Sequence, residues 1–162
     1  MELLDIYDEQ GNNTGKTIVR GETPKEKEHI ALSVIFIEND AHQFLIQKSS
    51  KEKGNNYTST GGHVNTKETP KEAIIREVQE ELGITLNTNE IEEYGYLLYD
   101  MPIRYIFYVK KNIDLQEISL QQEEVESISY KSIEEIEELI KTNKMLKSHG
   151  ILFHELLKRK SV

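Results

Sequence analysis

The sequence predicts an α/β or α+β layer fold, from three observations. A nearly continuous apolar run at residues 29–38 is typical of a strand that is buried on both faces, and residues 43–49 are expected to form the next strand. A capped amphipathic segment at 70–82 predicts a helix that interrupts the strands. Two more amphipathic segments, at 133–142 and 149–160, predict helices late in the chain. Strands interspersed with helices in this order favour a central sheet that is covered by helices.

Residues 1–28 are expected to form a β-hairpin followed by a charged connector. Apolar and polar residues alternate on both sides of the turn sequence GNNTG, which starts at Gly11. The hairpin offers an apolar surface on which a second copy of the chain could pair as a homodimer. A chain of this length is expected to form one domain, over residues 1–162, with a sizeable core. Further strands are predicted at residues 94–100, 104–110 and 125–130.

The composition excludes several classes of protein and of site. The sequence contains no Cys, which excludes disulfides, thiol nucleophiles and thiolate metal sites. Its net charge of −9 argues against binding to duplex nucleic acid, which requires a basic surface. No apolar run approaches the ~20 residues that span a membrane, and the first residues do not resemble a signal peptide. We therefore expect a cytoplasmic protein that makes no membrane contact.

The chain is organised around residues 61–84, which contain a helix with both ends marked. Thr69 is placed to cap the helix, with Pro70 at its first position and Glu72 completing a capping box. Gly83 follows the last periodic residue and suits the left-handed conformation that ends a helix. The preceding segment, GGHVNTKE, has neither a strand nor a helix period and is expected to be a loop.

Three carboxylates share one face of this helix, next to its buried edge. Glu77, Glu80 and Glu81 stand at spacings of three and four residues, where like charges repel and destabilise a helix. A hard cation such as Mg²⁺ or Mn²⁺ would remove that repulsion, and the small Ala73 is expected to leave room for it. Arg76 is placed to orient a carboxylate without binding the ion. A solvated, glutamate-rich helix is the alternative interpretation of these residues alone.

The complete spacing decides between these two interpretations. It consists of Gly62, five residues, Glu68, seven residues, and then the sequence REVQEELGI, which starts at Arg76. This pattern matches every fixed position of the signature of the Nudix hydrolases, and the sequence resembles that family. The resemblance implies an α/β/α sandwich with a central mixed sheet and with the signature loop and helix at one end.

The resemblance also implies an activity. Nudix enzymes use Mg²⁺ or Mn²⁺ to hydrolyse a diphosphate linkage in a nucleoside diphosphate joined to another group, by attack of metal-activated water on phosphorus. By position, the implied metal ligands are the carbonyl of Gly61 and the carboxylates of Glu68, Glu77, Glu80 and Glu81. Arg76 would orient the glutamates. Glu77 is the first choice as general base, and Glu124, in the segment QQEEVES, is the second.

Other residues are candidates for binding the substrate, which is expected to be a small nucleotide-derived diphosphate. Lys48, Lys53 and Arg104 are candidate phosphate contacts. Tyr57 is suited either to stack on a base or to pack in the core. His63 directly follows the glycines and is either an ordinary loop residue, a phosphate contact or a metal ligand.

Two other functions compete with hydrolysis. His29, His63 and the opening DIYDEQGNNTGK resemble the isopentenyl-diphosphate isomerase branch of the Nudix superfamily. That branch uses a catalytic Cys where this chain has Gly61, so the resemblance implies a hydrolase with isomerase-like relatives. The third alternative is a Nudix-fold module that binds a nucleotide without turnover. Mutually repelling glutamates would serve no purpose in a pure binding module, which argues against that alternative.

Overall fold

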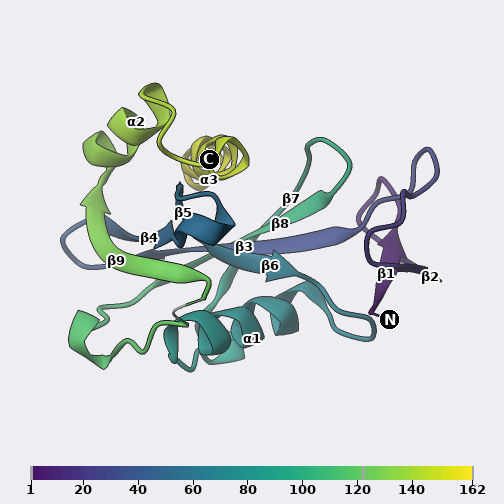
Figure 1. The fold of residues 1–162 in the computed structure, drawn as a ribbon, viewed down its shortest axis with the longest axis horizontal. Coiled ribbons are helices and arrows are strands. Elements are labelled where there is room, and N and C mark those ends of the chain that lie inside the picture. Colours follow the sequence, from purple (N-terminus) through teal and green to yellow (C-terminus); the bar gives the residue numbers. More distant parts are fainter. Residues whose placement is uncertain (1, 122, 162) are drawn as a thin grey trace.

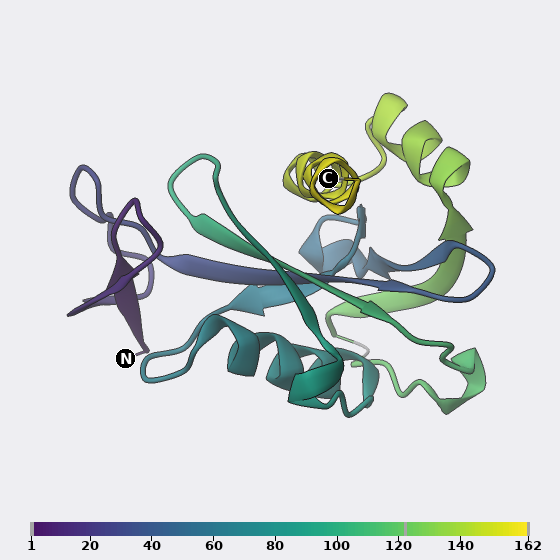
Figure 2. The same cartoon turned by 180° about the vertical axis from the view of Figure 1, so that it is seen from behind.

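The computed structural model describes residues 2–121 and 123–161, which form a mixed sheet between helices (Figures 1 and 2). The strands of this larger sheet are β3 (Ala31–Glu38), β4 (Gln43–Ser49), β5 (Tyr57–Thr58), β6 (Thr60–His63), β7 (Glu92–Leu98), β8 (Ile103–Lys110) and β9 (Val125–Ser132). The helices are α1 (Pro70–Leu82), α2 (Ile133–Lys141) and α3 (Lys147–Lys160), and short 3₁₀ turns occupy Lys51–Lys53, Thr88–Glu90 and Leu115–Glu117. No helix among the described residues is long and apolar enough to cross a membrane.

Strand β3 is the centre of the sheet. Its β-branched and aromatic residues favour a strand, and it pairs in parallel with β8 along its whole length. It pairs antiparallel with β6 near its start, but with β4 only through Glu38 and Phe44. Strand β4 then diverges from β3 and pairs with β9 instead. The hairpin expected between residues 29 and 49 therefore closes only at its turn.

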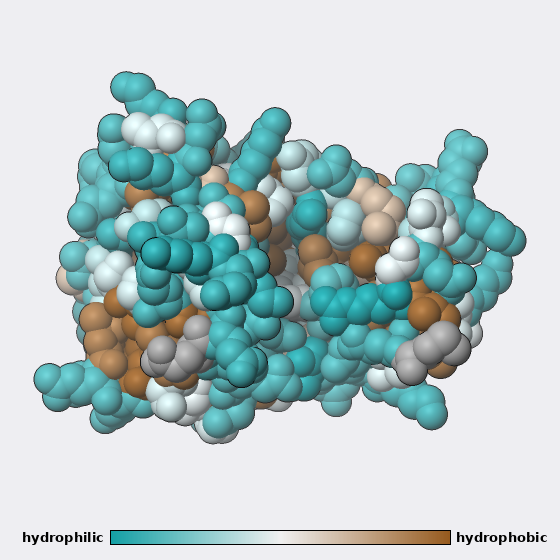
Figure 3. Space-filling model, viewed as in Figure 1, coloured by the Kyte–Doolittle hydropathy of each residue, from teal (hydrophilic) through white to brown (hydrophobic). Residues whose placement is uncertain are grey.

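The core lies in two layers, one on each face of the sheet. On one face, Phe36 packs against Phe153 of α3. On the other, Ile35 belongs to a buried cluster with Val78 and Leu82 of α1. Figure 1 shows α1 below the sheet and α3 above it, which is the layered arrangement that the sequence predicts. Polar residues cover most of the face in Figure 3, and apolar residues appear in a patch at the lower left, in a central hollow and near the hairpin at the right.

The structure differs from the sequence predictions mainly before helix α1. The two glycines at 61 and 62 lie in strand β6 rather than in a loop, because their backbone groups pair with β3 at Val34 and Ser33. Glycine has low intrinsic strand propensity, so only the tertiary pairing produces this strand. Strand β9 runs to Ser132, further than predicted, and α3 begins at Lys147.

The predicted N-terminal hairpin is present and stands at one end of the main sheet (Figure 1). It consists of β1 (Leu3–Tyr7) and β2 (Asn13–Val19). The buried carboxylate of Asp5 connects it to the loop that precedes α1. This carboxylate accepts hydrogen bonds from Thr66 Oγ1 at 2.7 Å and from the Lys67 backbone N–H at 3.0 Å. The hairpin therefore supports the loop that leads into the glutamate-bearing helix.

Replacing Asp5 with Asn is expected to lower the free energy of unfolding at pH 7 by about 1–3 kcal/mol. Burial by itself raises the pKa of Asp5. The hydrogen bonds from Thr66, Lys67 and Asn13 together lower the pKa by more than burial raises it, so the net shift is downward. A carboxyl whose pKa is depressed by folding stabilises the protein above its unfolded pKa of about 3.9 and loses that effect as the pH falls. The deficit of the variant, measured by urea unfolding, should therefore shrink from pH 7 to pH 3. An equal deficit at both values would contradict this role.

Candidate active site

Helix α1 carries the glutamates, and both of its ends are fixed as the sequence predicts. Thr69 Oγ1 accepts a hydrogen bond from the Glu72 N–H, and the Glu72 carboxylate accepts one from the Thr69 N–H. Gly83 ends the helix with a φ of 70°, a left-handed conformation that glycine adopts without strain. The capped helix is therefore a rigid support for the side chains on its surface.

The space beside the glutamates comes from Gly62, not from Ala73 as the sequence suggested. Ala73 is completely buried against Tyr7, Val64 and Ile103, so its small size serves the packing of the core. A helical wheel places Ala73 near the glutamates but cannot show which neighbouring element covers it. The carboxylate of Glu77 lies over Gly62, where a Cβ atom would overlap it. Absence of a side chain at residue 62 therefore allows Glu77 to lie against strand β6.

Arg76 holds three carboxylates and a backbone carbonyl. Its Nε donates to Glu68 Oε2 at 2.7 Å, and its Nη2 donates to Glu68 Oε1 at 3.1 Å and to the His63 carbonyl at 2.9 Å. Its Nη1 donates to Glu77 at 2.9 Å and to Glu80 at 3.1 Å. The bond with Glu68 raises the pKa of Arg76 despite its partial burial. The guanidinium is thus a charged clamp at the position where the sequence predicts an orienting residue.

The carboxylate of Glu81 has one buried oxygen. This oxygen, Oε2, has no hydrogen-bond partner among the described residues. Burial and the neighbouring Glu77 carboxylate raise the pKa of Glu81 well above the usual range of a carboxyl group. A buried oxygen without a partner is costly unless something else supplies a positive charge or a donor.

These residues offer the oxygen donors that a hard divalent cation prefers. The unpartnered oxygen of Glu81 and the crowded carboxylate of Glu77 both fit such an ion. Within residues 2–121 and 123–161, however, no three acidic or histidine side chains already form a cage that could hold a metal. Arg76 Nη1 binds one oxygen of Glu77 and one oxygen of Glu80. Ion binding would therefore use the other oxygen of each carboxylate or require the two side chains to shift.

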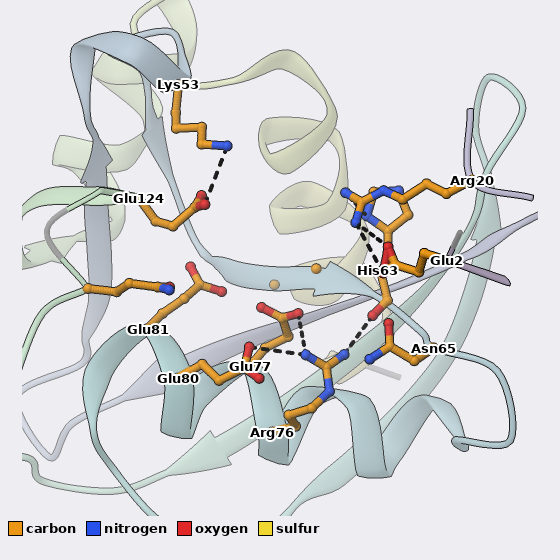
Figure 4. A pocket seen from close by; sticks show the side chains of 13 residues that line it. Glu2, Arg20, Lys53, His63, Asn65, Arg76, Glu77, Glu80, Glu81 and Glu124 are labelled. Atoms are coloured by element: carbon orange, nitrogen blue, oxygen red, sulfur yellow. Dashed lines mark hydrogen bonds and ion pairs between the residues drawn. The ribbon is translucent and has the colours of Figure 1, made fainter. Parts of the chain in front are cut away.

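The glutamates face a cavity of about 450 Å³ (Figure 4). Gly61 and Gly62 also line it. At one end, Lys53 Nζ lies 3.3 Å from a carboxylate oxygen of Glu124. At the other end lie Arg20, Glu2 and His63, as Figure 4 shows. All of the predicted metal-binding residues except Glu68 thus line one cavity. Two cations from distant segments, Lys53 and Arg20, line the same cavity.

Four predicted site residues do not line this cavity. Both carboxylate oxygens of Glu68 are bound by Arg76. Lys48 and Tyr57 line a separate cavity of about 330 Å³, where Lys48 Nζ lies 5.8 Å from the centre of the Tyr57 ring. Arg104 is buried; its Nη1 donates to the Tyr99 carbonyl at 2.7 Å, and desolvation lowers the pKa of Arg104.

Four residues that line the cavity were not predicted from the sequence. Glu2 and Arg20 flank the strands of the N-terminal hairpin, Asn65 lies in the loop before α1, and Gln121 lies in the loop before β9. Arg20 Nη2 lies 3.2 Å from His63 Nδ1, although 43 residues separate the two in sequence. Only the docking of the hairpin on the loop at residues 64–69 brings them together. The isolated Arg at the end of a predicted strand was the one available signal, and it did not specify a position.

Comparison with known families agrees with this geometry. The family model of the NUDIX domain matches residues 27–153. The chain belongs to the Nudix family. Nudix hydrolases act on nucleoside diphosphate derivatives and generally use divalent metal ions. This chain is accordingly a Nudix hydrolase.

Individual Nudix proteins extend this result. A Nudix hydrolase of Listeria monocytogenes is 34% identical over 144 residues, covering 86% of this chain and 85% of the relative. An 8-oxo-dGTP diphosphatase of Escherichia coli is 32% identical over 81 residues, covering 50% of this chain and 61% of that enzyme. The crystal structure of DR0079 from Deinococcus radiodurans has 18% identity and a TM-score of 0.75, covering 94% of this chain and 98% of that one. The last similarity supports the fold.

Proposed function

We propose that this Nudix hydrolase cleaves a diphosphate linkage in a nucleoside diphosphate joined to another group, in a reaction that requires Mg²⁺ or Mn²⁺. The observation that carries the proposal is the buried, unpartnered Oε2 of Glu81, which lies beside Glu77 in a cavity lined by carboxylates. A hard cation there would supply the missing positive charge. The same charge would offset that of a diphosphate, which otherwise repels a nucleophile.

The carboxylates of Glu77, Glu80 and Glu81, with the carbonyl of Gly61, would hold the ion. When bound, the ion supplies charge neutralisation and a water of lowered pKa. Arg76 acts as a positioning residue, since it holds Glu77 and Glu80 on the cavity side of α1. We assign Glu68, predicted as a ligand, to holding Arg76, because both of its oxygens already accept bonds from the guanidinium.

Glu124 is the better candidate for general base. Glu77, the first choice from the sequence, is occupied by Arg76 and is proposed as an ion ligand. Glu124 lines the same cavity from the opposite side, and its side chain is 41% exposed. Its Oε1 lies 3.3 Å from Lys53 Nζ, and a carboxylate at this position can act as a base toward a water in the cavity.

Cations at the two ends of the cavity suit the phosphates. Lys53 lies at one end and Arg20 at the other, where His63 lies beside it. Lys48, Tyr57 and Arg104 stay predictions as substrate contacts, since they would have to act from outside this cavity.

The two glycines of β6 allow the site to be tested separately from the fold. Gly62→Ala should lower hydrolysis by about 10–100-fold and change the free energy of unfolding by less than about 1 kcal/mol, because the new Cβ displaces only the flexible Glu77 carboxylate. In Gly61→Ala the Cβ would lie 2.5 Å from the Ser33 carbonyl oxygen, so the backbone must shift, at a cost of about 1–3 kcal/mol. Steady-state kinetics and urea unfolding of both variants measure this contrast. Equal loss of stability in the two would contradict it.

The experiment that tests the function is cleavage of a panel of diphosphates with Mg²⁺, with Mn²⁺ and with a chelator, followed by chromatography of the phosphorylated products. The panel contains nucleoside triphosphates, nucleoside-diphosphate sugars, dinucleotides and isopentenyl diphosphate. Formation of a nucleoside monophosphate and a second phosphorylated product that requires the added cation would support the proposal. Isomerisation of isopentenyl diphosphate without cleavage of any compound, or ligand binding without turnover of any compound, would refute it.

A further inference from the structure

Another cavity, of about 400 Å³ and called the second cavity below, lies between the N-terminal hairpin and the main sheet. The hairpin contributes Leu4 and Val19, and the other side contributes Ile30 and Met101. Arg20 and His63 line both this cavity and the carboxylate cavity, so the two adjoin at these residues. A molecule whose diphosphate lies among the glutamates can therefore extend past Arg20 to the hairpin.

Arg20 stands at the boundary in a form suited to bind phosphate. Its Nη1 donates to Glu2 Oε1 at 2.8 Å, and its Nη2 donates to His63 Nδ1 at 3.2 Å. Since a guanidinium can only donate, His63 Nδ1 is the acceptor; burial and Arg20 lower the pKa of His63 accordingly. The Arg20 side chain is 51% exposed, so its planar fork of donors is accessible to phosphate oxygens. Figure 4 shows it across the cavity from Lys53.

The walls of the second cavity are mainly apolar, and they offer few polar groups that are free to bind a ligand. The Glu22 carboxylate at its edge already accepts a hydrogen bond from the Val19 N–H at 2.9 Å. Among the described lining residues there is no Phe, Tyr or Trp on which a base could stack. A sugar would find polar partners only at the rim residues Arg20, Thr23 and His63, while the rest of its surface would lose hydration against apolar walls. The chemistry of the walls thus favours an aliphatic group.

We propose that this cavity binds an aliphatic or otherwise weakly polar group of the substrate, while Arg20 binds the phosphate next to it. The inference rests on the proposed function: it identifies the group joined to the diphosphate as an apolar one. The volume lies within the range of small-molecule sites, which are mostly apolar with a few well-placed polar groups.

The test compares two non-hydrolysable ligands, methylenebisphosphonate and its hexyl ester, by calorimetry in Mg²⁺. The wild-type protein should bind the hexyl ester about tenfold more tightly, because each buried methylene adds to affinity. Met101→Asp should reduce that preference, the ratio of the two affinities, by at least about fivefold. Leu98→Asp is the matched control, because Leu98 is equally exposed, at 39% against 38%, and does not line the cavity. The preference should survive in this control.

Two further variants separate the parts of the proposal. Val19→Ser should weaken binding of the hexyl ester alone, whereas Arg20→Ala should weaken both ligands by a similar factor, about tenfold. Equal binding of the two ligands by the wild type, or equal loss in Met101→Asp and Leu98→Asp, would overturn the inference. Diphosphate hydrolysis without an alkyl preference would refute this cavity assignment and leave the hydrolase intact. An alkyl preference without hydrolysis of any diphosphate would support the cavity and refute the proposed function.

Discussion

Glu81→Gln is expected to reduce hydrolysis by about 10³-fold while leaving the metal-free protein at least as stable as the wild type. The amide keeps the shape of the side chain but removes the negative charge that would hold the cation, and charge stabilisation by a metal contributes several kcal/mol to the transition state. In the absence of metal, the substitution removes a buried carboxyl whose Oε2 has no partner and which lies beside Glu77. A catalytic loss without a folding loss is the mark of a site that is built for a ligand. The measurements are kcat/KM at saturating Mg²⁺ and urea unfolding in chelator.

Glu138→Gln provides the matched control for this prediction, because Glu138 is exposed on α2, away from the cavity. It should leave both activity and stability unchanged. A thermal melt adds an independent measurement: Mg²⁺ should raise the Tm of the wild type and of Glu138→Gln, but not that of Glu81→Gln, because a ligand stabilises only the form that binds it. Full activity in Glu81→Gln would remove this residue from the proposed ion site.

The parts of this molecule that the sequence predicts are those that depend on local interactions. The capping box of Thr69 and Glu72 and the left-handed Gly83 need only neighbours within one helical turn, and all are present. The nearly continuous apolar run at residues 29–38 likewise predicted β3, and the segment after the following turn predicted β4. The fold class followed from the order of these elements.

The parts that the sequence missed depend on contacts between distant segments. Strand β6 forms at two glycines because β3 is available to pair with it, not because of its own propensity. Ala73 faces Tyr7 of the hairpin, which no helical wheel can include. Arg20 reaches His63 through a hairpin that docks on distant segments, partly through the buried carboxylate of Asp5. Such placements follow from tertiary packing, which a pattern within one segment does not contain.

Arg76→Ala should destabilise the protein by about 2–4 kcal/mol and lower hydrolysis by at least 10²-fold. The substitution leaves Glu68 and Glu77, whose side chains are only 16% and 15% exposed, without their cation. Breaking a fully buried pair costs more, but the Arg76 side chain is 26% exposed and solvent screens part of its charge. Arg76→Lys should be intermediate, since an ammonium cannot hold Glu68 through two parallel bonds. Urea unfolding and kcat/KM give the two quantities.

Mg²⁺ provides the decisive comparison for this residue. If the clamp and the cation neutralise the same carboxylates, saturating Mg²⁺ should recover part of the stability that Arg76→Ala loses, because the ion binds only the folded state. Arg159→Ala is the control. The Arg159 side chain is 27% exposed, its Nε pairs with Glu155 at 3.2 Å, and neither residue lines the cavity. Its smaller loss should be the same with and without Mg²⁺. Equal recovery in both variants would show a general effect of salt, and no recovery in Arg76→Ala would separate the clamp from the ion site.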